Sequence, residues 1–358
     1  MSAQLSSGKI TYVSIVARVL MNVEALNMAE TVGNVSRHRK APVVAVSENG
    51  DVNVVYVPSI SGESLAYHYQ RLLATIAKSR GLPVTQMDEA GYFMKFSDDN
   101  IIKKYYEDIE KKYSLTQKKD QCEIERIIVS SSIVADVGGF LYTDKMVKRT
   151  SRIRFGYMVP TLDAIKKGAT VSYPQLHVRY TPRPEEREQA LYYVETASSL
   201  YALSIGFNAS DVAELSTICK QDPNLQNEKK KRIEAAFDAL IALIDGVMFG
   251  AKKSRFSPMW DVMSLAVSVS KGPIEFNLSP PHSEKFLVES VERAMKITDV
   301  FKDMNIDIYW FSKEKINEPT QQSQGDKSAQ QQRRVEIIKS TSHTDALIKA
   351  KTKLLSYV

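Results

Sequence analysis

Cations gather in one short stretch without acids, KMVKRTSRIRFGYMVP at residues 145–160. Lysine and arginine bind phosphate oxygens through charge and hydrogen bonds, so this density predicts contact with a polyanion. If the stretch forms a strand, Arg152 and Arg154 lie on one face about 7 Å apart, while Ile153 and Phe155 face a core. The residues expected to contact phosphates here are Lys148, Arg149, Arg152 and Arg154.

Two further basic groups lie elsewhere in the chain. The first, Arg37, His38, Arg39 and Lys40, follows Gly33 and Asn34; the second is Lys252, Lys253, Ser254 and Arg255. Gly250 precedes the second group and, having no side chain, lets the backbone approach a phosphate closely. One such group alone is typical of a solvated surface. Three groups, each with hydroxyl or aromatic neighbours, together favour nucleic-acid binding.

The sequence has no strong catalytic or metal-binding motif. Its five histidines show no HxxxH spacing, and neither Cys122 nor Cys219 has a histidine close by in sequence. We therefore expect no catalytic residue, no metal ion and no cofactor. His177 shares a strand alternation with Gln175 and Arg179, so it either stacks on a base or satisfies a hydrogen bond in the core.

The bulk composition is that of an ordinary folded protein. The chain has 358 residues, of which 43% are hydrophobic and 25% charged, with a net charge of +6 and a pI near 9.0. No signal peptide or membrane span is expected. The two cysteines are far apart and predict no disulfide framework, which suits a reducing compartment and a cytoplasmic protein.

The elements that must position these residues are visible as periodic patterns. Alternation predicts a half-buried strand from Ile10 to Glu24 and further strands near 175–181, 191–207 and 260–270. Helices are predicted from a Ser61 cap to Gly81 and from Asp222 to Gly246. We expect a body at 1–318 with a largely helical insertion at about 84–145, a Gln-rich linker at 319–334, and a tail at 335–358 ending in a short helix.

The order of several longer motifs resembles a known family. With them, the sequence is similar to the backbone subunits of the archaeal type I-A CRISPR interference complex, the DevR-type RAMP proteins of Cascade, over about residues 10–270. The motifs are NVEALN, VGNVSRHRKAPVV, YVPSISGESLAYHYQ, ADVGGFLY, VKRTSRIRFGYMVP, QLHVRY and FGAKKSRFSP.

The resemblance implies an α+β fold, a modified RRM or ferredoxin-like antiparallel sheet backed by helices, with insertions forming palm-like and thumb-like parts. It also implies a non-catalytic scaffold that polymerises head to tail along a CRISPR RNA and leaves the bases free to pair with target DNA. The implied partners are CRISPR RNA, further copies of the chain, other Cascade subunits and, through the guide, DNA, with no membrane.

Residue roles carried over from the family fall on the basic groups and on one helix start. The segment Ser36–Lys40 matches the first RNA-contacting loop, and Asn34 just before it is also expected to contact RNA. Ser61, Gly62 and Ser64 match the loop and helix start that meet the sugar-phosphate chain, and Lys252–Arg255 match a basic loop. The alternative is an RNA-cleaving RAMP protein with His38 or His177 as general base. Related nucleases use an aspartate in the loop after the first strand, and the corresponding loop here has Glu30 but no aspartate.

Overall fold

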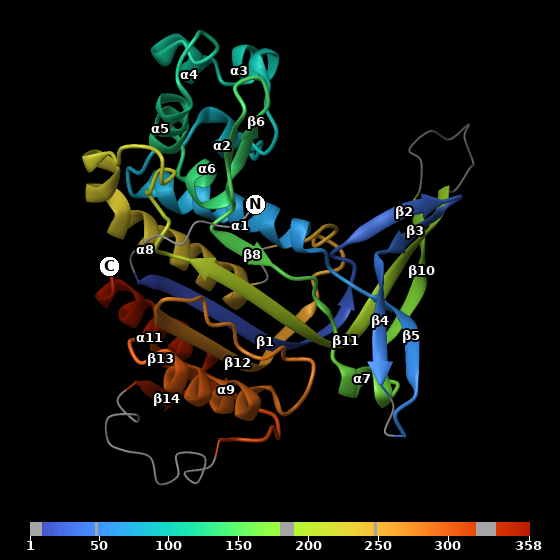
Figure 1. Ribbon diagram of the computed structural model, residues 1–358. Helices are drawn as coiled ribbons and strands as arrows, with labels where there is room; N and C mark the ends of the chain where they lie inside the picture. The colour runs from blue at the N-terminus through green and yellow to red at the C-terminus, as the bar shows by residue number, and fades with distance from the viewer. Residues whose placement is uncertain (1–8, 47–48, 180–189, 247–248, 320–333) are drawn as a thin grey trace, which may run out of the picture.

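The long strand predicted near the N-terminus forms the centre of the fold. In the computed structural model, which describes residues 9–46, 49–179, 190–246, 249–319 and 334–358, β1 (Ile10–Glu24) lies between β11 (Ala190–Asn208) and β12 (Met259–Gly272). Both neighbours run antiparallel to β1. The chain thus has a mixed α+β architecture with a large central sheet (Figure 1).

Seven more strands extend this sheet, which has the order β14-β13-β12-β1-β11-β3-β2, with β8, β9 and β10 also paired to β11. The central strands are antiparallel, but the β13–β14 and β11–β3 pairs are parallel, so the sheet as a whole is mixed and the expected antiparallel arrangement holds only for part of it. The parallel pairs occur where strands are added outside the antiparallel centre. The added strands are β2 (Met28–Val32), β3 (Val35–His38), β8 (Ile153–Phe155), β9 (Val159–Pro160), β10 (Val171–Arg179), β13 (Asn305–Ser312) and β14 (Val335–Lys339).

Helices cover both faces of the central strands. On one face lie α1 (Gly62–Ser79), α8 (Pro223–Asp245) and α11 (His343–Ser356), and on the other lies α9 (Phe286–Val300). The prediction that β1 is half-buried was therefore wrong, because its second face is covered by α9 and the segment before it. Arg18 on that second face is fully buried and is neutralised by Asp163 at 2.8 Å and Glu314 at 2.6 Å.

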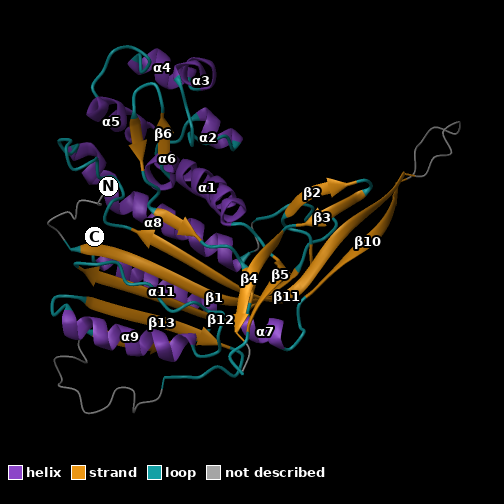
Figure 2. Ribbon diagram, turned by 45° about the vertical axis from the view of Figure 1, so that its right-hand side comes forward, coloured by secondary structure: helices purple, strands orange, loops and turns teal. Residues whose placement is uncertain are grey.

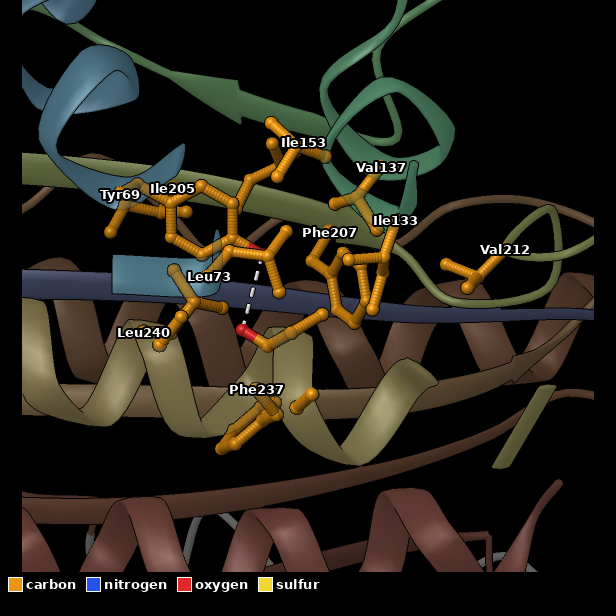
Figure 3. Packing of buried hydrophobic residues seen from close by; sticks show 14 of the residues in the cluster. Tyr69, Leu73, Ile133, Val137, Ile153, Ile205, Phe207, Val212, Phe237 and Leu240 are labelled. Carbon is orange, nitrogen blue, oxygen red and sulfur yellow. Dashed lines mark hydrogen bonds between the residues drawn. The ribbon is translucent and has the colours of Figure 1, made fainter. Parts of the chain in front are cut away.

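The two predicted helices are confirmed, together with their caps. The backbone amide of Ser64 donates to the Ser61 hydroxyl at 3.2 Å, and that of Asn224 donates to Asp222 at 2.8 Å. Figure 3 shows how α1 and α8 pack together over the sheet, with the Tyr69 hydroxyl donating to the Ala236 carbonyl at 3.1 Å. The apolar side chains gathered there include Leu73, Ile133, Val137, Ile153, Ile205, Phe207, Phe237 and Leu240.

The helical character predicted for the insertion is also confirmed. Five short helices and one hairpin stand above α1 in Figure 1. They are α2 (Gln86–Ala90), α3 (Asp99–Tyr105), α4 (Glu107–Tyr113), α5 (Gln121–Ser131), α6 (Ile133–Gly138), β6 (Phe140–Tyr142) and β7 (Val147–Arg149).

The cysteines contradict the sequence interpretation. Cys122 at the start of α5 and Cys219 in the loop before α8 form a disulfide, with their Cα atoms 5.4 Å apart. Their separation of 97 residues concealed the contact, because only the docking of the insertion on the body brings them together.

The continuous strand predicted at 147–160 is replaced by β7, β8 and β9. Its alternation breaks after Arg149, where the Arg152 amide donates to the Val137 carbonyl instead of continuing a ladder. The segment expected to be a loop before Lys40 forms the β2–β3 hairpin. Beyond it, β4 (Lys40–Val46) and β5 (Val52–Pro58) form a separate two-stranded ribbon that projects from the body together with β2, β3 and β10 (Figure 2).

The C-terminal helix is confirmed as α11, whose Leu347, Ala350 and Leu354 are fully buried. The strand β14 was not predicted, and it makes the tail part of the central sheet.

The Gln-rich segment lies almost entirely outside the described residues. None of the helices described is long and apolar enough to span a bilayer. The α7 helix (Leu162–Lys166) supplies the Asp163 that neutralises Arg18.

Candidate nucleic-acid interface

The densest basic group of the sequence is largely internal. Arg149 has no exposed side-chain surface, pairs with Glu125 at 3.0 Å and with Asp136, and donates to the carbonyls of Asp211 and Glu214. Burial raises the pKa of the Asp136 carboxyl, but Arg149 and Arg232 outweigh it and hold that pKa below its usual value. Arg149 therefore neutralises buried acids, and its prediction as an RNA contact was wrong.

Arg152 and Arg154 do not form the expected row of phosphate-binding side chains on one face of a strand. Arg152 is mostly buried and lies 3.6 Å from Asp211, and burial together with repulsion from Arg149 lowers its pKa to about 10. Arg154 is exposed on β8, where it pairs with Glu275 at 2.6 Å. Lys148 is exposed, but it lies on β7 in the insertion. The four cations thus lie in different environments, because the strand that was to align them is interrupted.

The second basic group is divided between surface and core. Arg37 is exposed near Glu30 at 3.6 Å, and Lys40 is exposed beside Glu195 at 3.0 Å. His38 is fully buried, with its Nε2 atom 2.6 Å from Glu24. This corrects the prediction of His38 as an RNA contact. Arg39 is half-buried, and the exposed Asn34 amide donates to the Leu191 carbonyl at 3.3 Å.

The start of α1 is more enclosed than expected. Ser61 is 3% exposed, caps the helix and donates its own amide to the Asn27 side chain at 3.0 Å. A Cβ atom on Gly62 would lie 2.4 Å from the Phe155 carbonyl oxygen, so glycine is needed for close packing on β8. Ser61 and Gly62 thus shape the helix start and are not exposed phosphate contacts. Ser64, one turn later, is only half-buried.

The third basic group lies on a tightly shaped loop. Gly250 and Lys252 both have left-handed backbone conformations, with φ of 92° and 53°, and a Cβ atom on Gly250 would lie 2.5 Å from Leu26. The amide of Ala251 donates to the Leu26 carbonyl at 2.8 Å. Phe256 is buried in a small cluster with Ala25, which anchors the far end of the loop.

Cations of this loop lie close to one another. Partial burial and the nearby charge of Arg255 lower the pKa of Lys252. Arg255 donates to the Tyr192 hydroxyl at 2.6 Å. Within the described ranges, no carboxylate forms an ion pair with Lys252 or Arg255. Mutual repulsion between cations is relieved when an anion binds between them, so this geometry suits a phosphate.

Beside the predicted Ser64, the structure adds two residues of α1 that sequence reasoning missed, His68 and Arg71. The three lie on one stripe of the helix. The Gly250 amide donates to His68 Nε2 at 3.2 Å, while His68 Nδ1 faces the Ser64 carbonyl at 2.7 Å. Burial, Lys253 and Arg71 lower the pKa of His68, which keeps the ring neutral. The spacing of Ser64, His68 and Arg71 was visible in the sequence. Only the contact of His68 with Gly250 shows that these residues lie beside the basic loop.

We call the combination the α1–loop basic patch. It consists of Ser64, His68, Arg71, Lys252, Lys253, Ser254 and Arg255.

His177 lies at the border of this region. Its ring stacks on Tyr192 with centroids 5.3 Å apart and meets the edge of Phe256 at 5.2 Å. Tyr192 and Phe256 therefore already contact the His177 ring, which favours a packing role for His177 over stacking on a base. In the described part of the chain, no group of three or more His, Cys, Asp or Glu side chains is arranged to hold a metal ion.

A family model agrees with this arrangement of motifs. Residues 15–291 match the family described as CRISPR-associated negative auto-regulator DevR/Csa2. The chain belongs to the DevR/Csa2 family. A curated relative from Saccharolobus solfataricus, the CRISPR-associated aCascade subunit Cas7/Csa2 2, is 38% identical over 290 residues, which are 79% of this chain and 86% of the relative. The CRISPR-associated protein Cas7/Csa2 1 of the same organism is 36% identical over 302 residues, 82% and 89% of the two chains.

Among solved structures, a chain of a CRISPR RNA-guided surveillance complex, pre-nicking, has a similar fold. The TM-score is 0.50 at 10% identity, and the match covers 97% of this chain and 100% of that chain. This likeness supports the fold only.

Proposed function

We propose that this DevR/Csa2 chain is a scaffold that holds a CRISPR RNA by its phosphate backbone in a type I surveillance complex. The observation that carries the proposal is the α1–loop basic patch, in which Arg255 lowers the pKa of the neighbouring Lys252 and the Gly250 amide joins the loop to His68 of α1. Backbone contacts leave the bases of the guide free to pair with target DNA. The aCascade membership printed for the 38% identical relative supports the same role.

We further propose that the central strands, together with α1 and α8, form an elaborated RRM or ferredoxin-like unit. The elements β1, α1, β8, β11, α8 and β12 follow one another in the chain in the βαββαβ order, and their strands lie side by side as β12-β1-β11-β8. Both α1 and α8 pack on the same face. The outer strands, the insertion and α9 are then additions to this unit.

The scaffold is proposed to lack nuclease activity. Of the two histidines considered as general bases, His38 is fully buried against Glu24 and His177 is enclosed by Tyr192 and Phe256. Neither ring is placed to take a proton from an RNA 2′-hydroxyl at the surface.

Its partners are proposed to be further copies of the chain, arranged head to tail, and the other Cascade subunits. A repeated heterologous contact that does not close into a ring follows an RNA of any length. We also place the protein in the cytoplasm because its proposed partners are nucleic acids, although the Cys122–Cys219 disulfide removes the argument from reduced cysteines.

The purified chain tests the proposal directly. It should copurify with short RNA, and the Lys252→Glu/Arg255→Glu variant should lose that RNA while keeping the native melting temperature. Lys296→Glu, which reverses an exposed charge on α9, is the matched control and should keep the RNA. Nucleic-acid-free native protein that also fails to bind added CRISPR RNA would refute the function.

A further inference from the structure

Three segments in which the sequence predicted RNA contacts, of which the last belongs to the α1–loop basic patch, are joined through one short piece of chain, residues 24–27. The Arg39 amide donates to the Asn27 carbonyl at 2.8 Å, the Ser61 amide to the Asn27 side chain at 3.0 Å, and the Ala251 amide to the Leu26 carbonyl at 2.8 Å. Segments 37–40, 61–64 and 250–255 are far apart in sequence, yet each has a hydrogen bond to this piece.

The Glu24 side chain holds residues 24–27 in place. Its carboxylate is fully buried and accepts from the Leu26 amide at 2.8 Å and from the Tyr201 hydroxyl at 2.9 Å, and it forms an ion pair with His38, whose Nε2 lies 2.6 Å away. A buried carboxylate with one cationic partner is sensitive to the charge of that partner, because loss of the charge leaves the anion uncompensated.

The His38 ring faces acceptors on both sides. Nε2 meets Glu24, and Nδ1 lies 2.9 Å from the Arg39 carbonyl, which also accepts from the Ser59 amide at 2.9 Å. A neutral imidazole donates from one nitrogen only, so two acceptors favour the charged ring. His38 thereby bridges Glu24 to the basic segment and to the strand leading into α1.

We propose that the buried Glu24–His38 ion pair is a positioning device that holds residues 24–27, and through them the basic segment 37–40, the start of α1 and the loop 250–255, in the RNA-binding arrangement. Neither side chain touches RNA. The inference rests on the proposed function and identifies a buried ion pair that controls the affinity of the chain for RNA.

The electrostatic surroundings support a charged His38 at neutral pH. Burial lowers its pKa, but the hydrogen bond and charge of Glu24 raise it more, so the net pKa lies above 6.5. The other titratable groups facing the pair come from β11. Burial and Glu24 raise the pKa of Tyr201 well above 10, so it stays a donor, and Glu195 accepts from the His38 amide while paired with Lys40.

A pH dependence of RNA binding follows from the sign of that shift. Because the pKa of His38 is raised in the folded state, the stabilising charge is present at low pH and is lost as pH rises through the folded pKa, above 6.5. RNA affinity should fall in the same window. His68 of the α1–loop basic patch has a lowered pKa and stays neutral there.

The test is fluorescence anisotropy of the full chain with a labelled single-stranded RNA at constant ionic strength, from pH 6.5 to about 9. The pKa of Lys252 in the α1–loop basic patch is also lowered, so any loss of affinity with pH that remains in a variant without His38 is assigned to Lys252. The native chain should lose about tenfold in affinity across the range. His38→Gln, which keeps a donor but does not titrate, should bind weakly at every pH. His343→Gln, which changes a partly exposed histidine paired with Asp245, is the control and should keep the native profile.

A native pH profile and native affinity in His38→Gln would overturn the inference. If that variant does not fold, the native chain still decides, because the midpoint of RNA affinity must coincide with the titration of the His38 ring followed by NMR. Binding that ignores this titration overturns the positioning role alone. A native chain that binds no RNA at any pH overturns the proposed function, and the inference with it.

Discussion

Two basic regions of the molecule have similar composition and opposite roles. The group at 145–154 has the higher density of cations, but Arg149, Arg152 and Arg154 each face a carboxylate. In the α1–loop basic patch, the charge of Arg255 lowers the pKa of Lys252, and neither cation has an ion pair with a carboxylate of the described residues. The density of positive charge along the chain is therefore a weaker guide to a phosphate site than the positions of the acids, which are supplied by distant segments.

The sharpest separation of the two regions comes from Arg149→Met. Removing Arg149 leaves the buried Glu125 uncompensated and leaves Asp136 with Arg232 as its remaining partner, which should lower the free energy of unfolding by about 3–5 kcal/mol. The RNA affinity of the folded fraction should not change. Chemical denaturation and RNA titration measure the two quantities. Lys148→Met, at the exposed neighbour, should change stability by no more than about 0.5 kcal/mol, and a stable Arg149→Met protein that loses RNA would reverse our assignment.

The disulfide tests the same internal region by another route. The Cys122→Ala/Cys219→Ala variant removes the link between α5 and the loop before α8, and we expect a loss of about 2–4 kcal/mol in the free energy of unfolding. Adding a reductant to the native chain should give the same denaturation curve. A reductant that has no effect would contradict the pairing.

The α1–loop basic patch should respond in RNA affinity alone. Lys252→Glu/Arg255→Glu should weaken binding about a hundredfold and reduce the slope of log affinity against log salt by about two, because each of the two cations is expected to neutralise one phosphate. The melting temperature should stay close to native, because Arg255 is exposed, Lys252 is only partly buried, and neither pairs with a carboxylate of the described residues. Salt titrations at several concentrations measure the slope, and an unchanged slope would remove these residues from the interface.

The smallest effect is expected for Arg154→Ala. This arginine is half-exposed and paired with Glu275, so its loss should cost no more than about 1 kcal/mol of stability. RNA affinity should stay within about twofold of native. The Glu275→Ala variant is the complementary test, because it removes the carboxylate that pairs with Arg154. If Arg154→Ala weakened RNA binding as strongly as the patch variant, the contrast between the two regions would fail.

Local patterns were enough to place most of the main elements. The alternation in β1, the Ser61 and Asp222 caps and the apolar stripe of α11 were all readable, because they depend on neighbours within a few residues. The same reasoning failed at 147–160, where the pattern was equally regular. There the strand is interrupted because Arg149 turns inward to acids from α5 and α6.

The candidate site divides in the same way. The sequence identified Lys252–Arg255 as a basic loop next to glycine, and the family resemblance led to the same loop. It did not identify Arg71 or His68 as part of the site, and it assigned His38 to the surface. Each of these depends on a contact between segments distant in the chain, such as His68 with Gly250 or His38 with Glu24.

By itself, the sequence determined the kind of protein: its family motifs, its long central strands and helices, and its surplus of cations. The tertiary structure alone decided which cations remain available to an anion. Periodicity and caps are short-range properties that the chain carries locally. Compensation of charge is a long-range property, because the acid that neutralises an arginine can come from any segment that folding brings within about 4 Å.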